Sequence, residues 1–203
     1  VVKAAGKVQN AEDRPPNREL YLSHINGLPV GDSRAQGVVR GSRFYHADLG
    51  ITLAFPTGWI VDNQRTKVVS YTEAKDAVMV VSAEAPPPGM APKEFLGRML
   101  QKVPTTEAEP LRVNNLDGYR AVVRSTTLPW GNQGPANVAV VYYNNLAYIF
   151  QGYTRQAAGL SSFEPVFLSS VKTFRRLKDN EFTAAEPDRI RVIQANNQTK
   201  IEQ

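Results

Sequence analysis

Short stretches in which apolar and polar residues alternate fill the first half of the chain, and this period of two predicts β-strands. They are residues 38–45, 51–55, 59–61, 67–71 and 77–83. The turn-forming residues 47–50 predict a hairpin between the first two stretches, and Pro56, Thr57 and Gly58 end the second. The pattern therefore predicts a meandering antiparallel sheet.

The second half of the chain adds two strand pairs. The expected strands are residues 111–114, 119–127, 137–143 and 146–153. Asp117 and Gly118 separate the first pair, and this dipeptide tolerates the positive φ that a tight hairpin needs. Asn144 and Asn145 separate the second pair, whose two arms are rich in β-branched and aromatic residues. We expect this second pair at the centre of the sheet.

Three segments carry apolar residues at helical spacing. The first is residues 17–25, which stop at Asn26 and Gly27. The second begins at Pro92, and the third has Pro165 as a first-turn residue. The apolar face of the second segment consists of Phe95, Leu96, Met99, Leu100 and Val103. That of the third consists of Phe163, Phe167, Val171 and Phe174. The fold class predicted is α+β, an antiparallel β-sheet covered by helices.

Polar sequence at both ends sets the expected domain organisation. Residues 1–16 predict a flexible leader, and residues 17–178 predict a single α+β domain. Residues 179–203 predict a polar linker, an edge strand at residues 189–193 and a tail that looks truncated.

Composition narrows the classes of protein. The 203 residues carry 24 Lys and Arg against 19 Asp and Glu, a net charge of +5 without a block of like charges. This distribution argues against a nucleic-acid-binding protein. No apolar run reaches the length of about eighteen residues that predicts a membrane span. The lack of cysteine excludes disulfides, thiol nucleophiles, zinc ribbons and iron–sulfur clusters.

The sequence offers few groups for catalysis. His24 and His46 stand far apart, so the helical two-histidine zinc signature is absent. A site built from both histidines and a carboxylate is the basis of one hypothesis, an enzyme in its own right. Residues 169–172 match the pattern S-x-x-K without its companion motifs. Glu107 and Glu109 are expected in a solvated linker rather than as a catalytic acid and base.

Five residues are candidates for binding. Arg40 and Arg43 on the first strand, with Arg120 and Arg124 on the second hairpin, form a basic face if their strands are neighbours. The alternative is an ordinary solvent-facing side of an antiparallel sheet. Trp130 is a candidate binding aromatic because its Gly-rich loop, expected to be mobile, leaves it less committed to the core.

Two local patterns resemble a known fold. The sequence Phe-Pro-Thr-Gly-Trp at residues 55–59 follows a strand, and Ser-Ser-Val-Lys-Thr-Phe at residues 169–174 closes a late helix. Together they resemble the PsbP/Mog-one-like α/β/α sandwich, in which helices cover an antiparallel sheet. Trp59, directly after the turn, is expected to be packed.

A longer resemblance points to a second family. Residues 21–32, 36–50 and 186–193 resemble the segment that follows the catalytic domain in bacterial cell-envelope zinc metallopeptidases, the CAAX-prenyl-endopeptidase-like gluzincins. In that family the H-E-x-x-H helix and a downstream Glu, which supply the zinc ligands and the general base, lie upstream of this segment. The resemblance implies an accessory region in the periplasm or cell envelope, with no cofactor in this chain and zinc only in an upstream catalytic domain.

These observations lead to two main hypotheses. The first is a non-catalytic C-terminal domain of a zinc metallopeptidase, which positions substrate or engages an envelope partner. The alternative is an independent PsbP/Mog-one-like module for protein binding or assembly. Neither hypothesis assigns a catalytic or metal-ligating residue to this chain, and whether the chain has activity of its own stays open.

Overall fold

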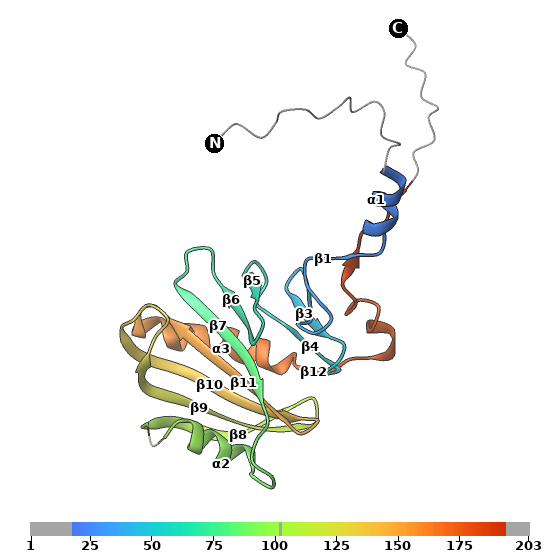
Figure 1. The fold of residues 1–203 in the computed structure, drawn as a ribbon. Helices are drawn as coiled ribbons and strands as arrows, with labels where there is room; N and C mark the ends of the chain where they lie inside the picture. Colours follow the sequence, from blue (N-terminus) through green and yellow to red (C-terminus); the bar gives the residue numbers. More distant parts are fainter. Residues whose placement is uncertain (1–17, 102, 194–203) are drawn as a thin grey trace, which may run out of the picture. The chain divides into compact units, whose positions relative to one another are not determined.

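The computed structural model describes residues 18–101 and 103–193, which form two compact units (Figure 1). The larger unit is Asp32–Pro187, and the smaller joins residues 18–31 to residues 188–193. The expected leader and tail lie outside the described residues, and the expected domain boundaries stay predictions. In the described part of the chain, no helix is long and apolar enough to cross a membrane.

The smaller unit contains one helix and one short strand pair. Helix α1, Arg18–Ile25, confirms the first predicted helix, and Gly27 follows its end with a φ of +84°. Strand β1, Pro29–Val30, pairs antiparallel with β13, Asp188–Arg189. The strand predicted at residues 189–193 is therefore wrong in extent, because beyond Ile190, which still bonds to the backbone of Gly27 and Leu28, the backbone N–H of Val192 donates to the side chain of Asn26 instead of to a strand.

A seven-stranded antiparallel sheet organises the larger unit. Its strands are β5, Ile60–Asn63; β6, Lys67–Tyr71; β7, Ala77–Glu84; β8, Thr105–Val113; β9, Leu116–Thr127; β10, Gln133–Tyr143; and β11, Leu146–Thr154. Their order is β5-β6-β7-β11-β10-β9-β8. The pair β10 and β11 joins through Asn144 and Asn145, and β11 is the middle strand, so the expected central position is confirmed.

A smaller four-stranded sheet has the order β12-β4-β3-β2. Its strands are β2, Val38–Arg40; β3, Arg43–His46; β4, Ile51–Ala54; and β12, Arg175–Arg176. The single strand predicted at residues 38–45 is wrong, because the chain turns back at Gly41, whose φ is +61°, and pairs Val39 with Phe44. The hairpin between β3 and β4 is confirmed.

The hairpin of β8 and β9 turns at other residues than predicted. Asn114 and Asn115 form the turn with φ values of +46° and +66°, which asparagine tolerates better than most residues. Gly118, expected in the turn, lies inside β9. The prediction of a polar linker around Glu109 is also wrong, since this residue lies in β8 opposite Arg120 of β9.

Helices cover both faces of the seven-stranded sheet (Figure 1). The helical segments of the larger unit are α2, Pro92–Met99; α3, Leu160–Lys172; and the short 3-10 helices η1, Ala157–Gly159, and η2, Asp179–Glu181. Val140 of β10 belongs to a cluster with Phe95 of α2, whereas Val141 belongs to a cluster with Phe167 of α3. Neighbouring residues of a strand point to opposite faces of the sheet, so α2 and α3 cover opposite faces. The predicted helix–sheet–helix architecture and the α+β class are therefore confirmed.

Helix α3 begins earlier than its proline predicts. Pro165 lies in the second turn rather than the first, because Leu160 and Phe163 are both buried in the core and extend the helix toward its N-terminus. Pro165 itself is on the exposed side, where water can take the place of the helical hydrogen bond that proline cannot donate.

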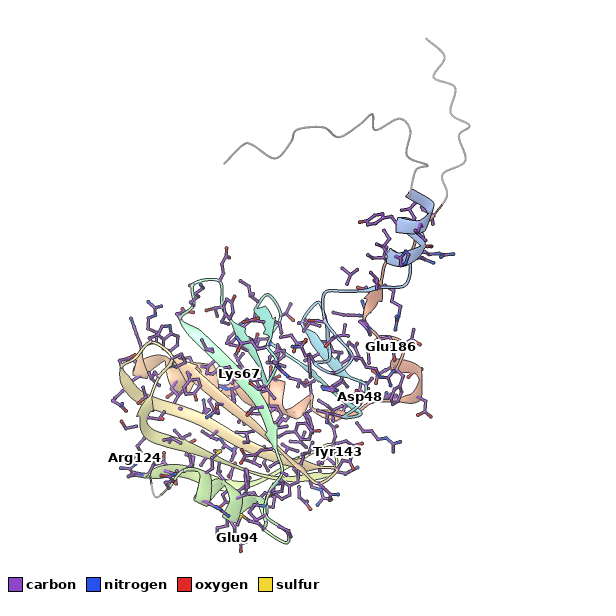
Figure 2. All side chains as sticks on the ribbon, viewed as in Figure 1. Asp48, Lys67, Glu94, Arg124, Tyr143 and Glu186 are labelled. Carbon is purple, nitrogen blue, oxygen red and sulfur yellow. The ribbon has the colours of Figure 1, made fainter. Side chains whose placement is uncertain are left out.

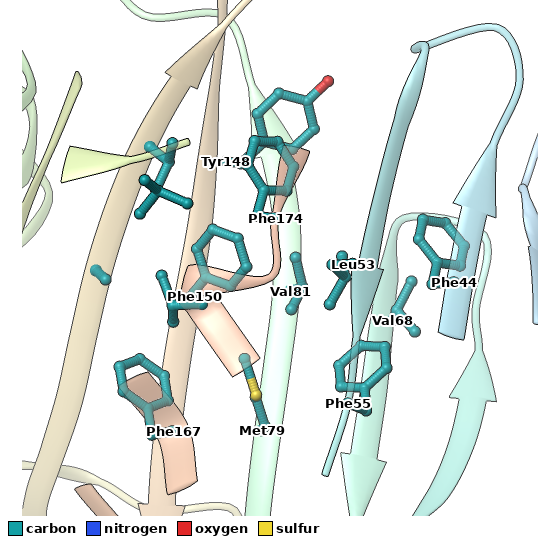
Figure 3. Packing of buried hydrophobic residues seen from close by; sticks show 14 of the residues in the cluster. Phe44, Leu53, Phe55, Val68, Met79, Val81, Tyr148, Phe150, Phe167 and Phe174 are labelled. Atoms are coloured by element: carbon teal, nitrogen blue, oxygen red, sulfur yellow. The ribbon is translucent and has the colours of Figure 1, made fainter. Parts of the chain in front are cut away.

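The main core lies between the seven-stranded sheet and the layer made by α3 with β3 and β4 (Figure 3). Phe174, the second residue after α3, packs its ring 4.7 Å from that of Tyr148 and 5.6 Å from that of Phe150, measured between centroids. Trp59 stacks on Phe163 at 5.6 Å, which confirms that it is packed. This core holds the Tyr148 ring in place for the site described below.

The stability of the larger unit is expected to fall between about pH 4.5 and pH 2 through Glu181. Arg175 binds its carboxylate with two nitrogens, at 2.6 and 2.7 Å, and these hydrogen bonds hold the pKa of Glu181 at about 2. A carboxyl with a lowered folded pKa adds stability above its unfolded pKa, and this contribution is lost as the pH falls through the folded pKa.

Glu181→Gln should therefore lower the free energy of unfolding by about 1–2 kcal/mol at pH 7 and differ little from the parent chain at pH 2. Urea unfolding at both pH values measures the difference. Glu73→Gln, at an exposed position, is the control and should change neither value. An equal loss at both pH values for Glu181→Gln contradicts the ion pair as its cause.

Candidate functional site

An open pocket of about 290 Å³ lies between the two sheets of the larger unit and is here named the inter-sheet pocket. Its apolar walls are Phe44, Leu49, Ile51, Leu53, Val68 and Val81. The alternation of β3 and β4 turns every second side chain toward the seven-stranded sheet, and β6 and β7 present theirs from the other side. The volume is near the lower end of the range for small-ligand pockets.

Tyr148 lines this pocket and carries a buried hydroxyl. Tyr148 is 2% exposed, and its Oη has no hydrogen-bond partner among the described protein atoms. Figure 3 shows this hydroxyl pointing away from the rings of Phe150 and Phe174. Burial, with a smaller contribution from Tyr143, raises the pKa of Tyr148 to about 12. The group therefore keeps its proton at neutral pH, and its oxygen is enclosed by the surrounding protein atoms.

His46 lines the same pocket as a neutral ring. It is 9% exposed, and its Nδ1 accepts a hydrogen bond from the backbone N–H of Leu49 at 3.3 Å. Burial lowers the pKa of His46, against the opposing effects of the Asp48 charge and a backbone hydrogen bond with Ala35. Within residues 18–101 and 103–193, no three His, Cys, Asp or Glu side chains gather closely enough to hold a metal ion.

The mouth of the pocket is positively charged. Arg65 and Lys67 line it and are both exposed (Lys67 is labelled in Figure 2). Neither makes a salt bridge within the described part of the chain. Gln64, also at the mouth, donates a hydrogen bond to Asp62 at 2.7 Å, which engages the acidic side chain nearest in sequence. The pocket thus combines an apolar interior with two cations at its entrance.

Arg40 and Arg43, predicted to lie on one strand, face each other across β2 and β3. Arg40 donates to the backbone oxygens of Ala184 and Glu186 at 2.8 and 2.9 Å and so ties the four-stranded sheet to the segment after β12. Arg43 is half-buried, and its Nη1 has no hydrogen-bond partner among the described residues. Their role in binding stays a prediction.

Arg120 and Arg124 both lie on β9, in the seven-stranded sheet, whereas Arg40 and Arg43 lie in the four-stranded sheet. The strands of the two pairs are therefore not hydrogen-bonded neighbours. Arg120 forms salt bridges with Glu109 and Glu164, which join β8, β9 and α3. The side chain of Arg124 is exposed.

Trp130 is anchored more firmly than its loop predicts. Its indole Nε1 donates to the backbone oxygen of Lys75 at 3.0 Å, and the guanidinium of Arg155 lies 5.5 Å from the ring centroid. The loop is also shorter than predicted, because β10 begins at Gln133. Trp130 is half-buried at the end of the sheet and does not line the inter-sheet pocket.

Removing the Tyr148 hydroxyl is expected to leave the free energy of unfolding unchanged or to raise it by up to about 1 kcal/mol, because Tyr148→Phe removes an unpaired buried polar group. Thr52→Val is the matched control, since the buried Thr52 hydroxyl donates to the Phe44 oxygen at 2.9 Å, and its loss should cost about 1 kcal/mol or more. Urea unfolding of both variants measures this. A comparable loss in both contradicts an unpaired Tyr148 hydroxyl.

The comparisons with known proteins give likenesses of fold. No known protein-family profile and no curated protein sequence matches this chain. Similar solved structures include cyanobacterial PsbP from Synechocystis, at 14% identity and a TM-score of 0.49, over 72% of this chain and 98% of that one. A Bacteroides thetaiotaomicron protein shares 11% identity at a TM-score of 0.47, over 70% of this chain and 51% of its own. The Saccharomyces cerevisiae Ran-binding protein Mog1p shares 14% identity at a TM-score of 0.45, over 64% of this chain and 92% of its own.

Proposed function

We propose that this chain is a non-catalytic protein-binding module and that the inter-sheet pocket is its docking site. The observation that carries the proposal is the combination of apolar walls with the cations Arg65 and Lys67 at the mouth. A docking site needs an apolar pocket that a partner side chain can fill and a few polar groups that fix its orientation.

The polar groups of the pocket suit binding better than catalysis. The titratable groups of its interior are a neutral, buried His46 held by a backbone contact and a protonated Tyr148 with a raised pKa. A general base must be poised near the working pH and within reach of a reacting proton. A protonated phenol whose oxygen is enclosed by the protein does not meet this requirement.

The finer proposal is that the module is an accessory domain of a periplasmic or cell-envelope zinc metallopeptidase, with the zinc held by an upstream catalytic domain. Its support is the sequence resemblance, and one contact joins two of the resembling segments. Residues 36–50 build β2, β3 and the pocket wall, and Arg40 within them donates to the backbone oxygen of Glu186, where the last resembling segment begins. Residues 36–50 belong to the larger unit, whereas most of residues 21–32 and 186–193 belong to the smaller one.

The mass of the native polypeptide tests the metallopeptidase proposal. An antibody raised to the purified chain should detect, in an immunoblot of source cells, a band well above 22.4 kDa whose upstream sequence contains H-E-x-x-H. A band near 22.4 kDa without a larger precursor overturns it and leaves an independent binding module.

Zinc binding and proteolysis test the non-catalytic assignment separately. The purified chain, incubated with zinc and then desalted, should retain no stoichiometric metal by elemental analysis and should not cleave an unfolded protein substrate. Stoichiometric zinc together with cleavage that a chelator abolishes contradicts the assignment. The variant His46→Ala distinguishes a zinc site in this chain from a contaminating protease. Zinc bound by this chain is lost in the variant, whereas the metal and activity of a contaminant stay unchanged.

A further inference from the structure

We propose that the inter-sheet pocket binds an apolar side chain of a partner protein and that acidic residues flank this side chain. This inference rests on the proposed protein-binding function and adds the chemistry of the segment that is bound. The interior of the pocket determines the bound side chain, and the mouth determines its flanking residues.

Three of the polar side chains that line the pocket are engaged or enclosed by the protein itself. His46 accepts a hydrogen bond from the backbone N–H of Leu49, and the side-chain oxygen of Gln36 accepts one from the Ser33 hydroxyl at 3.0 Å. The Oη of Tyr148 is enclosed by the surrounding protein atoms. A polar side chain bound here loses its hydrogen bonds to water and gains few in return, which lowers its affinity.

The walls and the size of the pocket favour one large apolar side chain. The volume of about 290 Å³ holds such a side chain, for example that of leucine, but is small for a cofactor such as a dinucleotide. A leucine side chain bound against these walls removes apolar surface of both partners from water and leaves no polar group of its own unpaired. The apolar side chains that line the pocket are Phe44, Leu49, Ile51, Leu53, Val68 and Val81.

The charge at the mouth determines the residues on either side of the bound side chain. Among the described residues that line the pocket, Arg65 and Lys67 carry the charge, and no Asp or Glu is present. Both cations are exposed and make no salt bridge in the described structure. Carboxylates that flank the bound side chain therefore meet two cations without an acidic partner. This charge complementarity favours an acidic segment and makes its association depend on salt.

Titration of the ¹⁵N-labelled chain with three short peptides and with octanoate tests the inference by NMR. The peptides are acetyl-Asp-Glu-Leu-Glu-Asp-amide, the same peptide with Asn in place of Leu, and the Leu peptide with Lys flanks. The acidic Leu peptide should shift the amide signals of Leu49, Val68 and Ser82 and bind at least about tenfold more tightly than the Asn peptide, whose side chain has a similar shape but is polar. The Lys-flanked Leu peptide should also bind at least about tenfold more weakly than the acidic one.

Variants at the mouth test the part played by charge. The double variant Arg65→Glu, Lys67→Glu should reverse the order of the acidic and the Lys-flanked Leu peptides, because carboxylates replace both cations. Both positions are exposed, so the variant should fold like the parent chain. Lys67→Ala alone should weaken binding of the acidic Leu peptide several-fold and reduce its dependence on salt. Lys93→Ala, which removes an exposed cation on α2, is the matched control and should change neither.

The outcomes separate this inference from the proposed function. Equal binding of the acidic and the Lys-flanked Leu peptides at the pocket overturns the acidic flanks, and equal binding of the Leu and Asn peptides overturns the apolar side chain. In both cases the docking site itself stands. Absence of any shift at the pocket with all three peptides overturns this inference and the docking site together. Tighter binding of octanoate than of any peptide overturns the choice of a protein segment and assigns the pocket to a small amphipathic anion.

Discussion

Replacing Phe174 with alanine is expected to lower the free energy of unfolding by about 3–5 kcal/mol. Phe174 is fully buried and packs against the rings of Tyr148 and Phe150 (Figure 3). Its backbone oxygen also accepts a hydrogen bond from Asn114 at 2.8 Å, which fixes the chain on both sides of the cavity that alanine leaves. Where the neighbouring atoms cannot move into the cavity, the loss of stability is at the upper end of the range for such substitutions.

Urea unfolding followed by circular dichroism measures this loss. Phe182→Ala is the matched control, because Phe182 is 41% exposed and its truncation should change stability by less than about 0.5 kcal/mol. Because Phe174 supports the ring of Tyr148, its removal should also shift the NMR signals around the inter-sheet pocket. A loss no larger than that of Phe182→Ala contradicts the packing described here.

The period of the apolar residues was enough to predict most of the elements. Residues 67–71, for example, form β6 as expected, because strands half-buried in a sheet must alternate. The errors occur where two local signals compete. Gly41 was one permissive residue inside a strand pattern, and two adjacent asparagines formed the turn that Asp117 and Gly118 also favoured. Which signal prevails depends on the strand register, and this is set by packing of the whole sheet.

The inter-sheet pocket could not be predicted from local sequence. Its lining comes from residues as far apart as Phe44 and Tyr148, which meet only when the four-stranded sheet packs on the seven-stranded one. Tyr148 belongs to the most apolar strand pair of the chain and gives no sign there of an unpaired hydroxyl. Arg120, in contrast, was conspicuous as a charge on a strand, and the structure shows it bound to two glutamates.

A second large loss of stability is expected for Gly118→Ala, at about 2–3 kcal/mol. Gly118 lies in β9 between β8 and β10, and a Cβ there meets the Val140 backbone oxygen at 2.4 Å and the Leu111 backbone oxygen at 3.2 Å. Backbone atoms held on both sides by strand pairing cannot rotate away as a side chain can. The sheet must therefore open locally, and the ladder hydrogen bonds lengthen with it.

Gly97→Ala makes the same chemical change with the opposite expected sign. Gly97 lies in α2, and a Cβ there meets no atom within 4 Å. Alanine in a helix restricts the unfolded chain and should raise stability by about 0.5–1 kcal/mol. Thermal unfolding of both variants measures the pair. If Gly118→Ala is as stable as Gly97→Ala, the close approach of the three strands at Gly118 is contradicted, and the glycine serves only the conformation of its own residue.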